Sequence, residues 1–312
     1  MSMKQVTNGN AFEYACVVAI KQVVSEYQEV YIVEDEHFNQ CKCDFVNLEE
    51  SVRNSLSVAA TKGIQSLLDY EANLTTSTSE ILEVRLNTSR AGQIGDVRDI
   101  IIGKKLSNWN IGISAKHNHN AVKHSRLSPS IDFGREWLQI PTPSNYFDTL
   151  AVLWNQLRSY KDAGVTWDSI NKEEIYHEVL LAFCDALKRM NEQNYVVPMN
   201  FMTYLLGRYD YYKIIVMTKE RQTILRAFNM NNTLHQKTLH GQQSKYNSRL
   251  SMPSNIHKIE FDTKSTVNIY FDKGWQISMR IHNASKIVEP SLKFDVQLVG
   301  VPTTLLGVVS NW

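Results

Sequence analysis

Two short segments in the middle of the chain carry side chains that could act together on a phosphate. Asp96 and Asp99 lie in GDVRDIII, and Ser114 and Lys116 lie in GISAK. Alternate residues of a strand point to the same face, so Ser114 and Lys116 share a face if their segment is extended. A hairpin that pairs the two segments would bring a carboxylate, a hydroxyl and an ammonium to one point. A carboxylate can bind Mg²⁺, and an ammonium can orient a water molecule or stabilise charge on a phosphate.

The spacing leaves open which aspartate would lie beside Ser114 in such a hairpin. Asp96 lies 18 residues before Ser114 and Asp99 lies 15 residues before it. On a regular strand the two aspartates would face different sides. We therefore expect one to take part in the chemistry and the other to be structural or paired with Arg98, and we favour Asp96 for the first role.

Charge is sorted along the chain, although the net charge is only +1 over 312 residues. There is no acid from Ile100 to Ile131, and there is none between Glu220 and Glu260. The first window contains Lys104, Lys105, Lys116, Lys123, Arg126 and three histidines, and the second contains Arg221, Arg226, Lys237, Lys245, Arg249, Lys258 and three more histidines. Lysine and arginine neutralise phosphates, and the asparagines and glutamines of the second window match base edges. The two windows favour a polyanionic partner over plain solvated loops.

The hydrophobic pattern predicts a mixed α/β protein that could position these residues. We expect helices over residues 9–27, 47–72, 132–139, 147–162 and 172–191, and strands over 81–87, 97–102, 109–116, 211–219, 221–229, 257–262, 267–272, 275–282 and 293–300. The chain shows no clear boundary between domains. We expect one domain over residues 1–312, in which 1–200 hold helices and the catalytic hairpin and 201–312 form a strand-rich DNA-recognition region.

The composition, with 43% hydrophobic and 21% charged residues, is that of a globular protein. No apolar run approaches the ~20 residues that span a bilayer, and Glu13 interrupts the N-terminal apolar segment, so we expect neither a membrane span nor a secretory signal. The four cysteines are few and irregularly spaced, which favours reduced thiols in a cytoplasmic protein.

The hairpin resembles the core of PD-(D/E)xK nucleases, in which an Asp precedes a strand bearing acid-x-Lys. Four longer patches resemble the HaeIII family of type II restriction endonucleases: GNAFEYA, GDVRDIII, GISAKHNHNAVKHSRLS and GWQISMRIHNASKIVEPSLKFDVQLVGVP. They extend from residue 9 to residue 302, so the resemblance covers essentially the whole chain. It implies a nuclease core with a central mixed sheet flanked by helices and additional C-terminal strands.

The resemblance also implies a function. It predicts a Mg²⁺-dependent endonuclease that cuts both strands of DNA, with GGCC as the usual target and with 5′-phosphate and 3′-hydroxyl ends. A cognate DNA methyltransferase would belong to the same system without being a physical partner, and a homodimer and a monomer both stay open.

Carried over residue by residue, the resemblance makes Lys116 the catalytic lysine and Asp96 or Asp99 the metal-binding aspartate. The chain departs from the broader pattern at Ser114, where an acid is expected. A hydroxyl is a poorer Mg²⁺ ligand than a carboxylate, which puts a second metal ion in doubt. Glu13, on the N-terminal helix, could supply the missing carboxylate, or it could form a surface salt bridge instead.

Polar residues after the hairpin and near the C-terminus are candidates for DNA contact. Ser278, Arg280 and His282 share one face of a predicted strand, as a groove-reading strand would require. The candidates are His117, Asn118, His119, Lys123, His124, Arg126, Arg280, His282, Asn283 and Lys293, with Lys123, His124 and Arg126 expected on a helix. An exposed basic helix face and a solvent-exposed strand face, neither with a specific role, are the alternatives.

Rival interpretations use the same residues. His117 and His119 suggest an HNH-type nuclease or a zinc site, but no CxxC or HxxxH pair supplies further ligands. Ser114 could mark a decayed nuclease that binds DNA without cutting it. A third alternative is an RNA-processing or metabolic protein with incidental basic loops, which would show no salt-dependent DNA binding.

Overall fold

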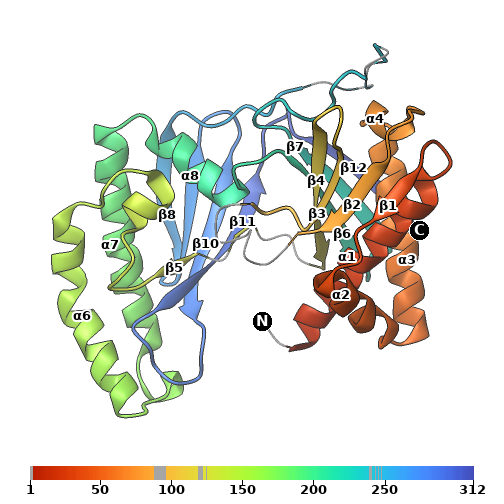
Figure 1. Cartoon of the computed structure of the whole chain (residues 1–312). Coiled ribbons are helices and arrows are strands. Elements are labelled where there is room, and N and C mark those ends of the chain that lie inside the picture. Colours follow the sequence, from red (N-terminus) through yellow and green to blue (C-terminus); the bar gives the residue numbers. More distant parts are fainter. Residues whose placement is uncertain are drawn as a thin grey trace. The chain divides into compact units, whose positions relative to one another are not determined.

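The computed structural model describes residues 3–87, 96–118, 122–123, 125–238, 241–242, 244, 246 and 248–312. It divides the chain into two compact units (Figure 1). The first comprises Met1–Asn120, Gly207–Leu250 and Thr303–Trp312, and the second comprises Ala121–Leu206 and Ser251–Pro302. Each unit takes segments from both sides of residue 200, so neither follows the expected division there. The expectation of a single endonuclease domain stays a prediction.

A seven-stranded mixed sheet forms the centre of the first unit, in the order β1-β2-β3-β4-β6-β7-β12. The strands are β1 (Val30–Ile32), β2 (Leu82–Leu86), β3 (Ile100–Lys104), β4 (Trp109–His117), β6 (Tyr211–Met217), β7 (Gln222–Phe228) and β12 (Leu306–Asn311). The β1–β2 and β4–β6 pairs are parallel and the other pairs are antiparallel. The parallel β4–β6 pair joins parts of the chain that are about 100 residues apart, which makes the sheet mixed.

Helices cover one face of this sheet: α1 (Met3–Val24), α2 (Glu36–Val46), α3 (Glu50–Leu68) and the short α4 (Ala72–Thr75). Apolar side chains of α1 and α3 pack with the inward-facing residues of the strands, such as Ile100, Ile113 and Ile214. Burial of each such side chain contributes roughly 1.5–3 kcal/mol. Gly63 lets α3 approach β6 closely, since a Cβ there would lie 2.8 Å from Cγ2 of Ile214.

The second unit contains a five-stranded antiparallel sheet in the order β5-β11-β10-β9-β8. Its elements are β5 (Arg126–Leu127), a π-helix (Gly134–Leu138), α6 (Ser144–Asp162), a 3₁₀ helix (Trp167–Ser169), α7 (Lys172–Gln193), α8 (Val197–Leu206), β8 (Ile256–Thr263), β9 (Thr266–Phe271), β10 (Gln276–Asn283) and β11 (Leu292–Gly300). Aromatic rings of Phe133, Trp137, Phe183, Phe201 and Phe294 pack together between helices and sheet. This cluster gives the unit a core of its own.

The predicted mixed α/β class is confirmed, with a central mixed sheet, flanking helices and additional C-terminal strands. The sequence interpretation missed α2, α8, β1 and β12, which are short, and the predicted helix at 132–139 is a π-helix over Gly134–Leu138. The prediction that Arg126 lies on a helix is wrong, because this residue belongs to β5 and pairs with Lys293. None of the helices in the described part of the chain has the length and apolar character needed to span a membrane.

Candidate active site

The register of the β3–β4 hairpin brings Asp99 to Ser114. Ile100 pairs with Ile113, and the backbone N–H of Asp99 donates to the Ile113 carbonyl at 2.8 Å. Three donors converge on one carboxylate oxygen, Oδ2 of Asp99: the Ser114 hydroxyl at 3.1 Å, the Ala115 backbone N–H at 2.8 Å and Lys116 Nζ at 2.8 Å. The predicted meeting of a carboxylate, a hydroxyl and an ammonium therefore occurs in the structure.

Asp96 lies in a different environment. Arg98 donates to both of its carboxylate oxygens, from Nε to Oδ1 at 2.8 Å and from Nη2 to Oδ2 at 2.7 Å. The guanidinium also lies 4.2 Å from the ring centre of Tyr209, and the Arg98 chain crosses Gly112, where a Cβ would come within 2.0 Å of it. These contacts favour Asp99 over Asp96 as the acid beside Lys116, the reverse of the order expected from the sequence. The reason is that Asp99 directly precedes β3 and continues its ladder through the backbone bond to Ile113, whereas Asp96 lies three residues earlier.

Glu13, on α1, lies within the electrostatic influence of Asp99 and Lys116. Burial and the nearby charge of Asp99 raise the pKa of Glu13 to about 8, although Lys116 opposes the shift. Burial works against the charge of Lys116, but the attraction and hydrogen bond of Asp99, together with the charge of Glu13, raise the pKa of this lysine above its ordinary value. Glu13, Asp99 and Lys116 therefore form one electrostatic group in which the lysine stays charged at neutral pH.

The donor atoms of this group fit Mg²⁺. Asp99 and Glu13 offer carboxylate oxygens and Ser114 offers a hydroxyl, and Mg²⁺ takes oxygen ligands. Two carboxylates close enough to raise the pKa of one of them form a site in which a cation is favoured. Glu13 thus stands where a carboxylate could replace the acid missing at Ser114.

Two further cations lie in the same row across the sheet: Lys213, which the sequence interpretation missed, and Arg226, which it named only as a basic residue of the second acid-free window. Ser114 pairs with Lys213 on β6, and Lys213 pairs with Arg226 on β7. Lys213 is buried, and burial together with the charges of Lys116 and Arg226 lowers its pKa to about 7. A lysine in the apolar run YYKIIVM was the available signal, because lysine is rarely buried without a partner.

Several other basic residues of the two acid-free windows have structural roles within the first unit. Lys104 is buried and donates to the Asn73 carbonyl at 3.1 Å. His235 is buried against the hydroxyl of Tyr212 at 3.0 Å, and Arg249 donates from Nε to the Met230 carbonyl at 2.8 Å. The absence of acids in a window therefore does not by itself identify a surface that meets a polyanion.

The segment after β4 is only partly described. Asn118 ends the strand with a φ of 52°, and its side-chain amide is held by Thr218, whose backbone N–H donates to Oδ1 of Asn118 at 2.9 Å. His117 is half-buried, and burial lowers its pKa. His119 and His124 lie outside the described residues. Among the described residues, the histidine that joins a cluster of three metal-binding side chains is His37 and not His117.

The polar face of the second unit's sheet gathers three of the predicted DNA-binding residues. Arg126 of β5 pairs with Lys293 of β11, and Lys293 pairs with His282 of β10. Directly paired residues in an antiparallel sheet point to the same side, so these three side chains form a basic row. Arg126 also donates to the Ser291 hydroxyl at 3.1 Å, which limits its motion.

The remaining candidates of the second unit are engaged within it. Arg280 is exposed and lies 3.7 Å from Oδ2 of Asp295. Asn283 accepts from the Tyr176 hydroxyl at 2.7 Å and donates to the Ser285 carbonyl at 2.7 Å, so its amide has structural partners. Lys123 has no regular secondary structure and places its ammonium 3.7 Å from the ring centre of Tyr204.

Comparison with known proteins agrees with the resemblance seen in the sequence. A family described as HaeIII restriction endonuclease matches residues 9–302 of the chain. The type II restriction enzyme HaeIII of Haemophilus aegyptius is 35% identical over 317 residues, which cover 100% of this chain and 99% of that enzyme. No solved structure gives a significant match. Because the family match and this relative both span nearly the whole chain, the chain belongs to the HaeIII restriction endonuclease family.

Proposed function

We propose that this type II restriction endonuclease cuts both strands of duplex DNA by Mg²⁺-dependent hydrolysis at a short site, with GGCC as the target that its family implies. The convergence of Ser114, Ala115 and Lys116 on Oδ2 of Asp99 is the observation that carries the proposal. Glu13 supports it, because its carboxylate lies near enough to Asp99 and Lys116 for their charges to act on its pKa.

Each residue of the site has a distinct role in this proposal. Asp99 and Glu13 would hold the ion, which would supply polarisation of the phosphate and a lowered pKa for a water molecule. Lys116 is charged, since its pKa is raised, so it orients the attacking water and stabilises negative charge on the phosphate rather than taking a proton. Ser114 fixes the orientation of the Asp99 carboxylate. The attack of water on phosphorus breaks the bond to O3′, which leaves a 5′-phosphate and a 3′-hydroxyl.

The basic row Arg126–Lys293–His282 is proposed to contact DNA phosphates, which fix the register of a protein on the duplex. Arg280, exposed on the same face of β10 as His282, is proposed as a further contact. We also propose action in the cytoplasm beside a cognate DNA methyltransferase and, as an open alternative to a monomer, a homodimer.

The proposal is tested with Lys116→Ala and plasmid DNA in the presence of Mg²⁺. Loss of the ammonium should lower the cleavage rate by about 10³-fold, as is typical for removal of a transition-state donor. DNA binding in a mobility-shift assay at fixed salt should stay close to that of the parent. Lys105→Ala is the control, because this lysine lies on the same hairpin and is exposed, with its ammonium 2.6 Å from Glu83.

Cleavage by Lys116→Ala at close to the parental rate would exclude the proposed mechanism. Sequencing the ends of DNA cut by the parent protein tests the target and the cut position in the same experiment, and ends without a 5′-phosphate would contradict the hydrolysis as written.

A further inference from the structure

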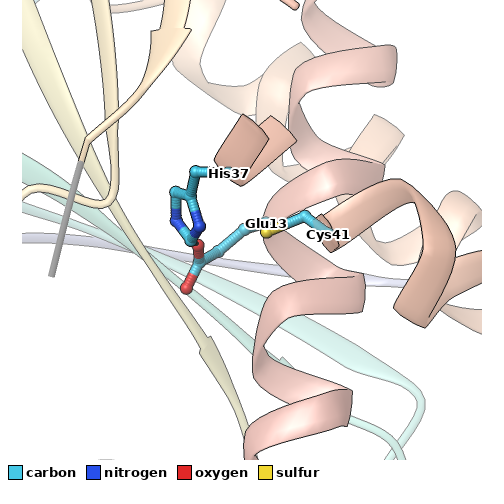
Figure 2. Close-up of side chains that lie close together, drawn as sticks. All are labelled: Glu13, His37 and Cys41. Atoms are coloured by element: carbon cyan, nitrogen blue, oxygen red, sulfur yellow. The ribbon is translucent and has the colours of Figure 1, made fainter. Parts of the chain in front are cut away.

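We propose that Glu13, His37 and Cys41 form a Zn²⁺ site beside the active site, and that this site shares Glu13 with the Mg²⁺ site. Figure 2 shows the Glu13 carboxylate, the His37 imidazole and the Cys41 sulfur close together. The ligand atoms of all three residues lie within 4.8 Å of one another. The binding of Zn²⁺ stands on this geometry alone, whereas its effect on cleavage rests on the proposed function.

Two packed helices hold the three ligands in place. His37 and Cys41 lie four residues apart on α2, which places them one above the other on the same helix face. Asp35 caps the N-terminus of α2, since its side chain accepts a hydrogen bond from the Phe38 backbone N–H at 2.8 Å. On the facing helix α1, Tyr14 packs against Phe38 with ring centres 5.4 Å apart, which sets Glu13 opposite the His37–Cys41 face.

The ligand atoms lie somewhat farther apart than around a bound ion. Glu13 Oε2 lies 3.9 Å from His37 Nε2. Ligand atoms of a tetrahedral Zn²⁺ are roughly 3.3–3.8 Å apart, given bonds of about 2.0–2.3 Å. Cys41 is buried and fixed, while Glu13 and His37 are only partly buried and can rotate by the small amount required. Three protein ligands leave a fourth position for water, an arrangement that Zn²⁺ sites commonly have.

The chemistry of the ligands selects the metal. A thiol and an imidazole suit Zn²⁺ and related ions, whereas Mg²⁺ takes oxygen ligands. Burial, and then the nearby carboxylates of Glu13, Asp44, Asp35 and Asp99, raise the pKa of the Cys41 thiol to about 12, so without a metal ion the thiol is protonated. A bound metal reverses this by coordinating the thiolate directly.

Sharing of Glu13 gives the site a consequence for the enzyme. A carboxylate that coordinates Zn²⁺ with His37 and Cys41 is withdrawn from Asp99, so Zn²⁺ should inhibit Mg²⁺-dependent cleavage. Addition of Zn²⁺ at a fixed Mg²⁺ concentration should therefore slow cleavage by the parent protein. The same addition should slow Cys41→Ser much less, with each protein compared with its own rate in Mg²⁺ alone.

Binding itself is tested by titrating the full-length protein with Co²⁺, which replaces Zn²⁺ and reports its ligands by absorption. We expect a thiolate-to-metal charge-transfer band and tetrahedral d–d bands at one ion per chain, both removed by Zn²⁺. Cys41→Ser should lose the charge-transfer band. His37→Gln, a change of a partly exposed residue, should weaken Co²⁺ binding by at least about 10-fold, because even changes outside the ligand shell cost that much.

Cys43→Ser is the matched control, because Cys43 lies on the same helix but is exposed, and this variant should keep the parental spectrum. The proposal is overturned if the parent shows no thiolate band, if Cys43→Ser loses it, or if His37→Gln binds Co²⁺ as tightly as the parent. His37→Gln decides the matter if Cys41→Ser does not fold. The spectra need no DNA, so a protein that binds Co²⁺ in this way but does not cut DNA would separate failure of the proposed function from failure of the metal site.

Discussion

Two ion pairs, Asp96–Arg98 and Asp99–Lys116, have their aspartates three residues apart just before β3. They differ in contact geometry, exposure and surroundings. Asp96 is held by Arg98 through both carboxylate oxygens, and the two side chains are 10% and 12% exposed. Asp99 is held by Lys116 through one oxygen, with 22% and 31% exposure, and Glu13 lies in its electrostatic field. The first pair is a nearly buried two-point contact, whereas the second is a more exposed one-point contact within a larger electrostatic group.

The difference follows from the chemistry of the two cations. The planar guanidinium of Arg98 matches a carboxylate at two points and also stacks on Tyr209, so it satisfies Asp96 and fixes the chain that enters β3. The ammonium of Lys116 is a point charge on a flexible chain and can exchange its partner. A lysine can therefore release the carboxylate to a metal ion and turn to a phosphate, which an arginine in a two-point pair cannot do without loss of structure.

The largest effect is expected from Asp99→Asn. The change removes a proposed metal ligand and the charge that holds Lys116, so cleavage should fall by about 10³-fold or more. Single-turnover cleavage at saturating protein measures this, and circular dichroism checks that the variant is folded. A variant that cuts well in Mg²⁺ would show that Asp99 only supports the hairpin, and the comparison between the two pairs would lose its functional meaning.

The hairpin, and the meeting of a carboxylate with Ser114 and Lys116, could be predicted from the sequence, but the carboxylate that lies beside them is that of Asp99 and not that of the favoured Asp96. Which of the two aspartates binds metal stays a prediction. The four residues from 105 to 108 connect the strands, and Asn108 adopts a φ of 49°. A turn of this length places residues that are 15 apart opposite each other, so Asp99, rather than Asp96, lies level with Ser114. Alternation of side chains predicts a strand well, whereas the register depends on where the strands stop.

Contacts between distant parts of the chain could not be predicted from one sequence. Lys213 joins the row of Asp99 and Ser114 through the parallel β4–β6 pair, and nothing local to β6 indicates that pairing. The short helix α2 was also missed, because its sequence EHFNQCKCDFV is mostly polar and buries only Phe38 and Cys41. The cluster of Glu13, His37 and Cys41 depends on that helix, so it became visible only in three dimensions.

Asp96→Asn should reduce stability rather than cleavage, and its effect should be smaller than that of Asp99→Asn. Removal of one partner from a nearly buried pair leaves the Arg98 charge without its carboxylate and should lower the free energy of unfolding by about 1–3 kcal/mol. Cleavage per folded molecule should stay within about 10-fold of the parent, since the group around Asp99 is intact. Urea unfolding measures the stability.

Asp168→Asn provides the control for this variant. It breaks an exposed pair with Lys172 at 3.3 Å, and such pairs contribute about 0–1 kcal/mol. If Asp96→Asn were no less stable than this control but lost cleavage, Asp96 would belong to the active site after all, and the roles of the two pairs would have to be exchanged.

Lys213→Met should change the free energy of unfolding least of the three variants. The pH dependence of that change should reveal the charge state of Lys213 beside the Asp99–Lys116 pair. The folded pKa of Lys213 is lowered to about 7 from the ordinary 10.5, so above pH 7 the unfolded chain binds a proton that the folded chain does not. The contribution of Lys213 to stability therefore rises with pH between 7 and 10.5 and is least favourable below pH 7. This predicts that the free energy of unfolding of the parent rises by about 1 kcal/mol between pH 6 and pH 8 from this group alone.

Relative to the parent, Lys213→Met should thus be more stabilised at pH 6 than at pH 8 by that amount in urea unfolding. Lys105→Met, on the exposed end of the hairpin, should leave the slope of stability against pH unchanged. Equal differences at both pH values would mean that Lys213 is charged throughout this range, and that the positive row beside Asp99 is stronger than its burial suggests.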